Sequence, residues 1–172
     1  MKKILVIGSP GAGKSVFARK LRDVSGLPLY YLDRLFHRAD RTTASREEFD
    51  GALEKILETD RWIIDGNYLR TMEMRLQQCD TVFFLDLPVS DCLEGAASRI
   101  GRAREDMPWV ETEFDPEFRQ YISDFPKEQL PRIYELLERF RSDVKIFTFH
   151  TREEADGWIS SSIIQQGEKF EA

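Results

Sequence analysis

The sequence has 172 residues, of which 41% are hydrophobic and 33% charged, and this balance predicts one soluble globular domain over residues 1–172. No apolar run approaches the roughly 20 residues that cross a bilayer, and the short apolar run near the N-terminus does not predict a signal peptide. The net charge of −6 argues against general nucleic-acid binding, which needs a basic face.

Apolar runs and helical periodicity alternate along the chain, which predicts an α/β fold with a parallel sheet. The expected strands are 3–7, 28–32, 62–64, 81–85 and 144–149. The expected helices are 16–24, 47–58, 68–77, 90–100, 127–140 and 152–164. The polar stretch 102–114, interrupted by Pro108, predicts a mobile loop or lid. Cys79 and Cys92 lack metal or redox spacing, which favours a reducing, cytoplasmic setting.

A glycine-rich motif joins the first expected strand to the first expected helix. It fits the phosphate-binding pattern G-x-x-x-x-G-K-[ST] at every fixed position. Its backbone N–H groups and the helix N-terminus favour an anion. We expect Lys14 to reach the β- and γ-phosphates of ATP and Ser15 to ligate Mg²⁺ directly. The residues expected to bind ATP are Gly8, Ser9, Pro10, Gly11, Ala12, Gly13, Lys14, Ser15 and Val16.

Three expected strands end in an aspartate, at Asp33, Asp65 and Asp86. The carboxyl ends of parallel strands meet at one edge of the sheet, where the glycine motif also emerges. We therefore expect Asp33 and Asp65 to hold Mg²⁺ through water. The alternative is that these residues cap the following helix, and for Asp86 capping is the favoured interpretation because Pro88 follows it.

Longer motifs extend from these residues over most of the chain. They are Leu32-Asp33-Arg34-Leu35-Phe36, Trp62-Ile63-Ile64-Asp65-Gly66-Asn67-Tyr68 with Thr71 and Arg75, Phe84-Leu85-Asp86-Leu87-Pro88, and Arg104-x-Asp106-Met107. With them the chain resembles the adenylate-kinase-like P-loop kinases. Within these it is most similar to the group called topology modulation proteins (FlaR-type). The glycine motif alone would indicate only an NTPase.

The resemblance implies a P-loop three-layer αβα fold, with a five-stranded parallel sheet of order 2-3-1-4-5. It implies an acceptor-binding region over 33–75 and a lid region over 99–118. Catalysis would then involve Lys14, Asp33 and the lid arginines Arg99 and Arg102, and Arg104 is a further candidate. The acceptor would meet Asp33, Asp65, Asn67, Tyr68 and either Arg70 or Arg75, although a surface role for Arg75 is an equal alternative.

The leading hypothesis is therefore a kinase that uses ATP and Mg²⁺ to phosphorylate a small molecule or nucleotide, as a monomer or homodimer. The chain departs from the adenylate kinases after the third strand, where Asn67-Tyr68-Leu69-Arg70 replaces their Phe-Pro-Arg. The acceptor is therefore not identified by the sequence. The alternatives are a nucleotide-binding regulator linked to DNA topology and a simple NTPase.

Overall fold

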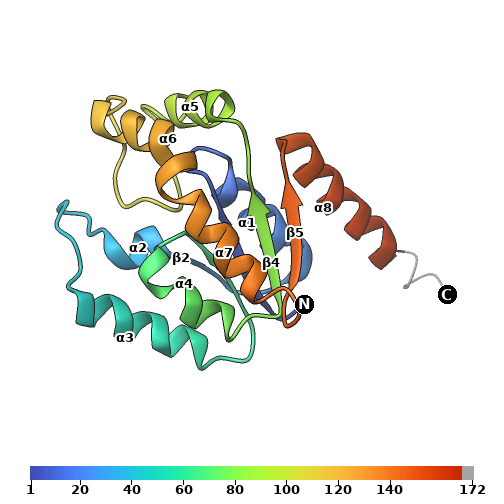
Figure 1. Ribbon diagram of the computed structural model, residues 1–172. Coiled ribbons are helices and arrows are strands. Elements are labelled where there is room, and N and C mark those ends of the chain that lie inside the picture. Colours follow the sequence, from blue (N-terminus) through green and yellow to red (C-terminus); the bar gives the residue numbers. More distant parts are fainter. Residues whose placement is uncertain (168–172) are drawn as a thin grey trace.

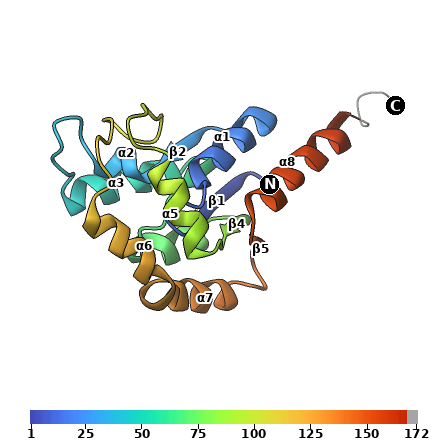
Figure 2. The same ribbon diagram turned by 90° about the horizontal axis from the view of Figure 1, so that it is seen from above.

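The computed structural model describes the backbone of residues 1–167 and the side chains of residues 1–162. These residues form three layers, with helices on both faces of one sheet (Figure 1). Seen from above, α1 (Lys14–Ser25) and α8 (Arg152–Gly167) lie on one side of the sheet and α7 (Leu130–Arg139) on the other (Figure 2). Within the described residues, no helix combines the length and apolar character needed to cross a membrane.

The sheet has five strands, and all of its pairs are parallel, in the order β2-β3-β1-β4-β5. This confirms the predicted fold class and strand order. The strands are β1 (Lys3–Gly8), β2 (Leu29–Tyr31), β3 (Trp62–Asp65), β4 (Thr81–Leu85) and β5 (Lys145–Phe149). Val6 of β1 lies opposite Asp65 of β3, so the end of β3 meets the start of the glycine loop.

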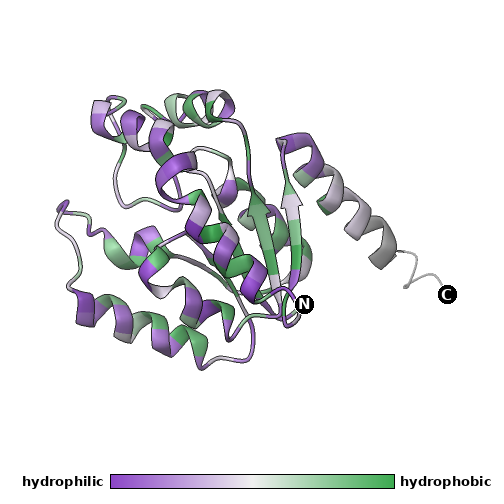
Figure 3. Ribbon diagram, viewed as in Figure 1, coloured by the Kyte–Doolittle hydropathy of each residue, from purple (hydrophilic) through white to green (hydrophobic). Residues whose placement is uncertain are grey.

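Alternate residues of the central strands enter two separate hydrophobic cores. Leu5 and Ile7 pack with α3 (Arg46–Leu57), α4 (Leu69–Leu76) and α7 on one face. Ile4 and Val6 pack with α1, α5 (Val89–Ala97) and α8 on the other. Continuous burial of β3 and β4 is typical of a parallel sheet that is covered on both faces. Accordingly, β4 is hydrophobic along its length, whereas the helices alternate between hydrophobic and hydrophilic turns (Figure 3).

Two helices were not predicted from the sequence. The short α2 (Leu32–Phe36) follows β2 directly, and α6 (Pro116–Glu128) begins in the last residues of the expected lid region, 99–118, and continues beyond it. The expected helix over 127–140 is divided, because α6 ends at Glu128 and α7 begins at Leu130. Residues 102–114 contain no regular helix or strand, as expected. The helices α2, α4, α5 and α6 therefore border the carboxyl edge of the sheet, where the glycine loop emerges.

Candidate functional site

The glycine loop leaves β1 at the carboxyl edge of the sheet and enters α1 without a side-chain cap. Gly8 and Gly11 have φ angles of 138° and 84°, in the region that favours glycine. A β-carbon would lie 2.1 Å from the carbonyl oxygen of Leu85 at Gly8, and 2.0 Å from that of Cys92 at Gly11. Close contact with β4 and α5 therefore requires glycine at both positions and fixes the path of the loop.

Lys14 points into the loop rather than into solvent. Its Nζ donates to the carbonyl oxygens of Gly8 and Ser9, both at 3.0 Å. Burial lowers the pKa of Lys14, while the carboxylate of Asp65 acts in the opposite direction. The ammonium group thus lies within the curve of the loop, where an anion bound by the loop would meet it.

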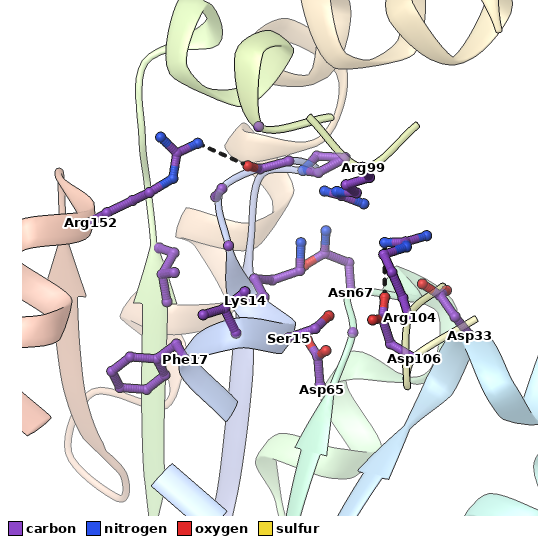
Figure 4. A pocket seen from close by; sticks show the side chains of 18 of the residues that line it. Lys14, Ser15, Phe17, Asp33, Asp65, Asn67, Arg99, Arg104, Asp106 and Arg152 are labelled. Carbon is purple, nitrogen blue, oxygen red and sulfur yellow. Dashed lines mark hydrogen bonds and ion pairs between the residues drawn. The ribbon is translucent and has the colours of Figure 1, made fainter. Parts of the chain in front are cut away.

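The loop borders a cavity of about 660 Å³, a size typical of ligand pockets. Figure 4 shows its side chains converging from α1, α2, the end of β3, the segment after α5 and the start of α8. It brings together most of the predicted site residues: Pro10 to Val16, Asp33, Asp65, Asn67, Tyr68 and Arg99. Gly8 and Ser9 lie behind this lining and contribute carbonyl oxygens to Lys14.

Asp65 ends β3 inside the cavity and is only 5% exposed. Its Oδ1 atom is buried and has no hydrogen-bond partner in the part of the chain that the structure describes. Its carboxylate lies beside the Ser15 hydroxyl (Figure 4). Burial raises the pKa of Asp65 to about 6, against the opposing effects of Lys14 and Ser15. An unpaired buried carboxylate oxygen beside a hydroxyl fits a hydrated Mg²⁺ ion, which takes oxygen ligands and retains water.

The structure describes no group of three or more His, Cys, Asp or Glu side chains in residues 1–162 that would form a metal site by itself. Mg²⁺ in kinase sites is held by one or two protein oxygens together with substrate phosphates. Ser15 and Asp65, with Asp33 across the cavity, match that kind of site.

The raised pKa of Asp65 predicts a pH-dependent stability. Because the native state holds this proton more tightly than the unfolded chain, the free energy of unfolding should fall as the pH rises from 3.8 through about 6. The loss should be about 3 kcal/mol and complete above that range. Urea unfolding of the wild type and of Asp65→Asn without Mg²⁺ measures it. The asparagine variant should gain stability relative to the wild type as the pH rises. If the free energies of unfolding of the two proteins change with pH in parallel, the raised pKa of Asp65 is contradicted.

Asn67 and Tyr68 shape the cavity by contacts within the protein. The Asn67 amide donates to the carbonyl oxygen of Gly8 at 2.7 Å and accepts from its N–H at 3.0 Å, which extends the pairing of β1 and β3 through a side chain. Tyr68 has an unusual positive φ of 38°, and its hydroxyl donates to Oδ1 of Asp33 at 2.8 Å. Asn67 therefore holds the glycine loop, while Tyr68 orients Asp33.

The segment after α5 supplies two arginines to the cavity, Arg99 and Arg104. Arg104 donates to Asp106 at 3.0 Å and to Glu111 at 2.9 Å. Asp106 is also 3.5 Å from Arg19 of α1, and this buried carboxylate ties the segment to α1. Within residues 1–162, Arg99 makes no side-chain hydrogen bond or ion pair, so its guanidinium remains available to a ligand.

Four sequence expectations are corrected. Arg102 is exposed and does not line the cavity. Arg70 forms a two-point contact with Asp50 and borders a separate, smaller cavity. Asp86 accepts from the Tyr134 hydroxyl and does not line the cavity, and α5 begins without a side-chain cap, so the favoured capping role of Asp86 is not observed. Arg70 and Asp86 are held by nearer partners, whereas Arg102 is exposed to solvent.

Arg75 is the fourth and largest departure, because it is fully buried and lies outside the cavity lining. Its guanidinium donates to the carbonyl oxygens of Gly66 at 2.8 Å and of Tyr68 at 3.1 Å, and also to Asn67 and Thr71. It stabilises the turn after β3 and has no free donor face to offer an acceptor.

Several residues that line the cavity were not functional candidates in the sequence analysis, and Arg152 and Asp106 are the charged ones with the most contacts. Arg152 begins α8 and donates to the carbonyl oxygens of Gly11 at 3.2 Å and Asp91 at 2.7 Å (Figure 4). Only its position after β5 could have indicated it. Asp106 was noted only as part of the Arg104-x-Asp106 motif, and that spacing was the available signal for an ion pair.

No family model and no curated protein match the chain. Solved structures do match it. A shikimate kinase from Acinetobacter baumannii in complex with shikimate has 17% identity and a TM-score of 0.53, and the match covers 98% of this chain and 94% of that chain. A shikimate kinase from Bacteroides thetaiotaomicron has 19% identity and a TM-score of 0.53, with 98% of each chain covered. The chain therefore has the same fold as these two shikimate kinases.

Proposed function

We propose that this protein transfers the γ-phosphoryl group of ATP, with Mg²⁺, to a small-molecule acceptor. One observation carries the proposal. A single cavity joins the glycine loop to the buried carboxylate of Asp65 and the guanidinium of Arg99, and neither Oδ1 of Asp65 nor this guanidinium has a partner in residues 1–162. The shikimate kinases of the same fold support a kinase. Assignment to the topology modulation group rests on the motif resemblance alone.

Phosphoryl transfer depends mainly on positioning and on charge stabilisation around the moving group. The loop amides and Lys14 would hold the triphosphate, and Ser15 with Asp65 and Asp33 would hold Mg²⁺, which neutralises charge on the phosphate oxygens. An acceptor hydroxyl oxygen forms a bond to the γ-phosphorus while the bond to the β–γ bridging oxygen breaks, and ADP leaves with that electron pair. Asp33 would accept the hydroxyl proton.

Steady-state assays with ATP and Mg²⁺ across nucleosides, nucleoside monophosphates and small hydroxylated metabolites test the proposal. At least one acceptor should raise ATP turnover and yield a phosphorylated product. ATP turnover that no acceptor alters, and that depends on Lys14, would identify a simple NTPase instead.

Substituting Lys14 by alanine should lower kcat by about 10²–10³, because the ammonium group would stabilise charge on the transferring phosphoryl group. The matched control is Lys55→Ala, which removes an exposed lysine on α3 and should leave turnover unchanged. Both variants are compared by coupled assay at saturating ATP. The kinase proposal fails if turnover is the same in the wild type and in Lys14→Ala.

A further inference from the structure

The charges that line the cavity are unevenly distributed. Its Lys and Arg residues are Lys14, Arg19, Lys20, Arg99, Arg104 and Arg152, from α1, the segment after α5 and α8. None of the seven arginines between residues 33 and 75, nor the lysine there, lines the cavity. The cavity wall formed by α2, the start of α4 and α6 therefore contributes no positive charge of its own.

We call this wall the acceptor wall and define it as Asp33, Tyr68, Leu69, Phe118, Tyr121 and Gln129. Asp33 carries its only formal charge. One carboxylate oxygen, Oδ1, accepts from Tyr68, so Oδ2 remains to accept from a ligand. The pKa of Tyr121 is raised first by burial and then by the charge of Asp33, which indicates that Asp33 acts across the wall.

The aromatic residues of the acceptor wall offer broad apolar contact. Tyr68 stacks on Phe49 with ring centroids 5.0 Å apart, and Phe118 stacks on Tyr121 at 6.3 Å. These contacts hold the rings in place, so a planar ligand would meet pre-ordered surfaces. Leu69 extends the apolar lining, and Gln129 adds one uncharged polar side chain.

Arg104 is the cavity cation whose charge is most fully compensated. It is paired with Asp106 and Glu111, and its side chain is only 14% exposed. An anionic acceptor would have to displace one of these carboxylates and also approach Asp33, a like charge in a partly desolvated cavity. Arg99 has neither a hydrogen-bond nor an ion-pair partner in residues 1–162, but its guanidinium would contact the transferring phosphoryl group and so would not be free to bind an anionic acceptor.

We propose that the acceptor is an uncharged, ring-containing molecule with a free hydroxyl group, and not a phosphorylated or carboxylated one. This inference rests on the proposed function and narrows it. The ring would lie against Tyr68, Phe118 and Tyr121. The hydroxyl would donate to Asp33 and attack the γ-phosphorus, with the proton passing to the Asp33 carboxylate and ADP leaving.

Calorimetric titration of the full chain, saturated with Mg²⁺ and a non-hydrolysable ATP analogue, tests the inference with matched pairs of probes. The pairs are nucleosides with their 5′-monophosphates, and hydroxymethylbenzamide with hydroxymethylbenzoate. At least one uncharged member should bind about tenfold or more tightly than its anionic partner. Equal or tighter binding of the anionic members, or no binding of any uncharged member, would overturn the inference. Binding of the ATP analogue is measured first, and its failure would instead overturn the proposed function.

A second experiment tests why anions are excluded. Glu111→Gln removes one of the two carboxylates that neutralise Arg104, and it should reduce the discrimination against the anionic probe several-fold. Glu113→Gln makes the same charge change nearby, at an exposed residue, and should leave the discrimination unchanged. Equal effects in the two variants would contradict the proposal that the compensated charge of Arg104 excludes anionic acceptors.

Discussion

Substituting Arg99 by alanine should lower kcat by about 10³–10⁵, with a much smaller change in the affinity for ATP. The guanidinium lines the cavity, has no partner in the described residues and lies close enough to Lys14 to lower its pKa. In the transition state the bond to the leaving oxygen lengthens and charge is spread over the equatorial oxygens of the transferring group, so an arginine that contacts these oxygens acts mainly on the rate. Steady-state kcat and a separate nucleotide titration measure the two effects.

Arg102→Ala is the matched control for this prediction. It removes an arginine three residues further along the same segment, where the side chain is exposed and outside the cavity lining. Its kcat should remain close to that of the wild type. Similar losses of kcat in the two variants would show that the segment acts through its general charge, and would contradict the specific role of Arg99.

The parts of the site that the sequence predicted are those whose geometry is local. The glycine loop follows from one motif between a strand and a helix, because the φ angles at Gly8 and Gly11 are set by close contacts that only glycine allows. Asp65 was predicted because a residue that ends a parallel strand must lie at the loop edge of the sheet. Both inferences needed only the neighbouring residues and the strand direction.

The arginines show why the rest was not predictable. Arg70, Arg75 and Arg102 have the same side chain and equally plausible positions in the sequence. Their environments depend on partners that no periodicity indicates: the carboxylate of Asp50, a ring of backbone carbonyl oxygens, and solvent. Arg152 enters the cavity from 141 residues beyond the carbonyl oxygen to which it donates. Such contacts arise only when the layers are assembled.

The missed helix α6 is a different kind of error, because its start signal was present in the sequence. Asp115 caps the helix by accepting from the N–H of Glu117 at 2.9 Å, and Pro116 occupies the first turn. The polar composition of the preceding segment favoured a continuous lid. Local capping signals were therefore better evidence here than composition, and α6 supplies Phe118 and Tyr121 to the acceptor wall.

Arg75→Ala should lower the free energy of unfolding by about 3–5 kcal/mol, a loss comparable to that of truncating a large buried core side chain. The substitution leaves a cavity in the core and removes the donors from the carbonyl oxygens of Gly66, Asn67 and Tyr68. Burial lowers the pKa of Arg75 to about 9, so the guanidinium still carries its proton at neutral pH. The dipoles of the backbone carbonyl groups compensate the positive charge of Arg75, since no carboxylate pairs with it in the described residues.

Arg70→Ala is the matched control, because it removes the same charge from an exposed position on the same helix. Arg70 is exposed and pairs with Asp50, and a pair of this kind contributes about 1 kcal/mol or less. Urea unfolding of both variants measures the difference, and Arg75→Lys should recover only part of the loss because one ammonium cannot reach all of these carbonyl oxygens. Similar losses for Arg70→Ala and Arg75→Ala would contradict a structural role. A large loss confined to Arg75 would establish that the turn bearing Asn67 and Tyr68, and through them the glycine loop and Asp33, is held in place by a buried cation.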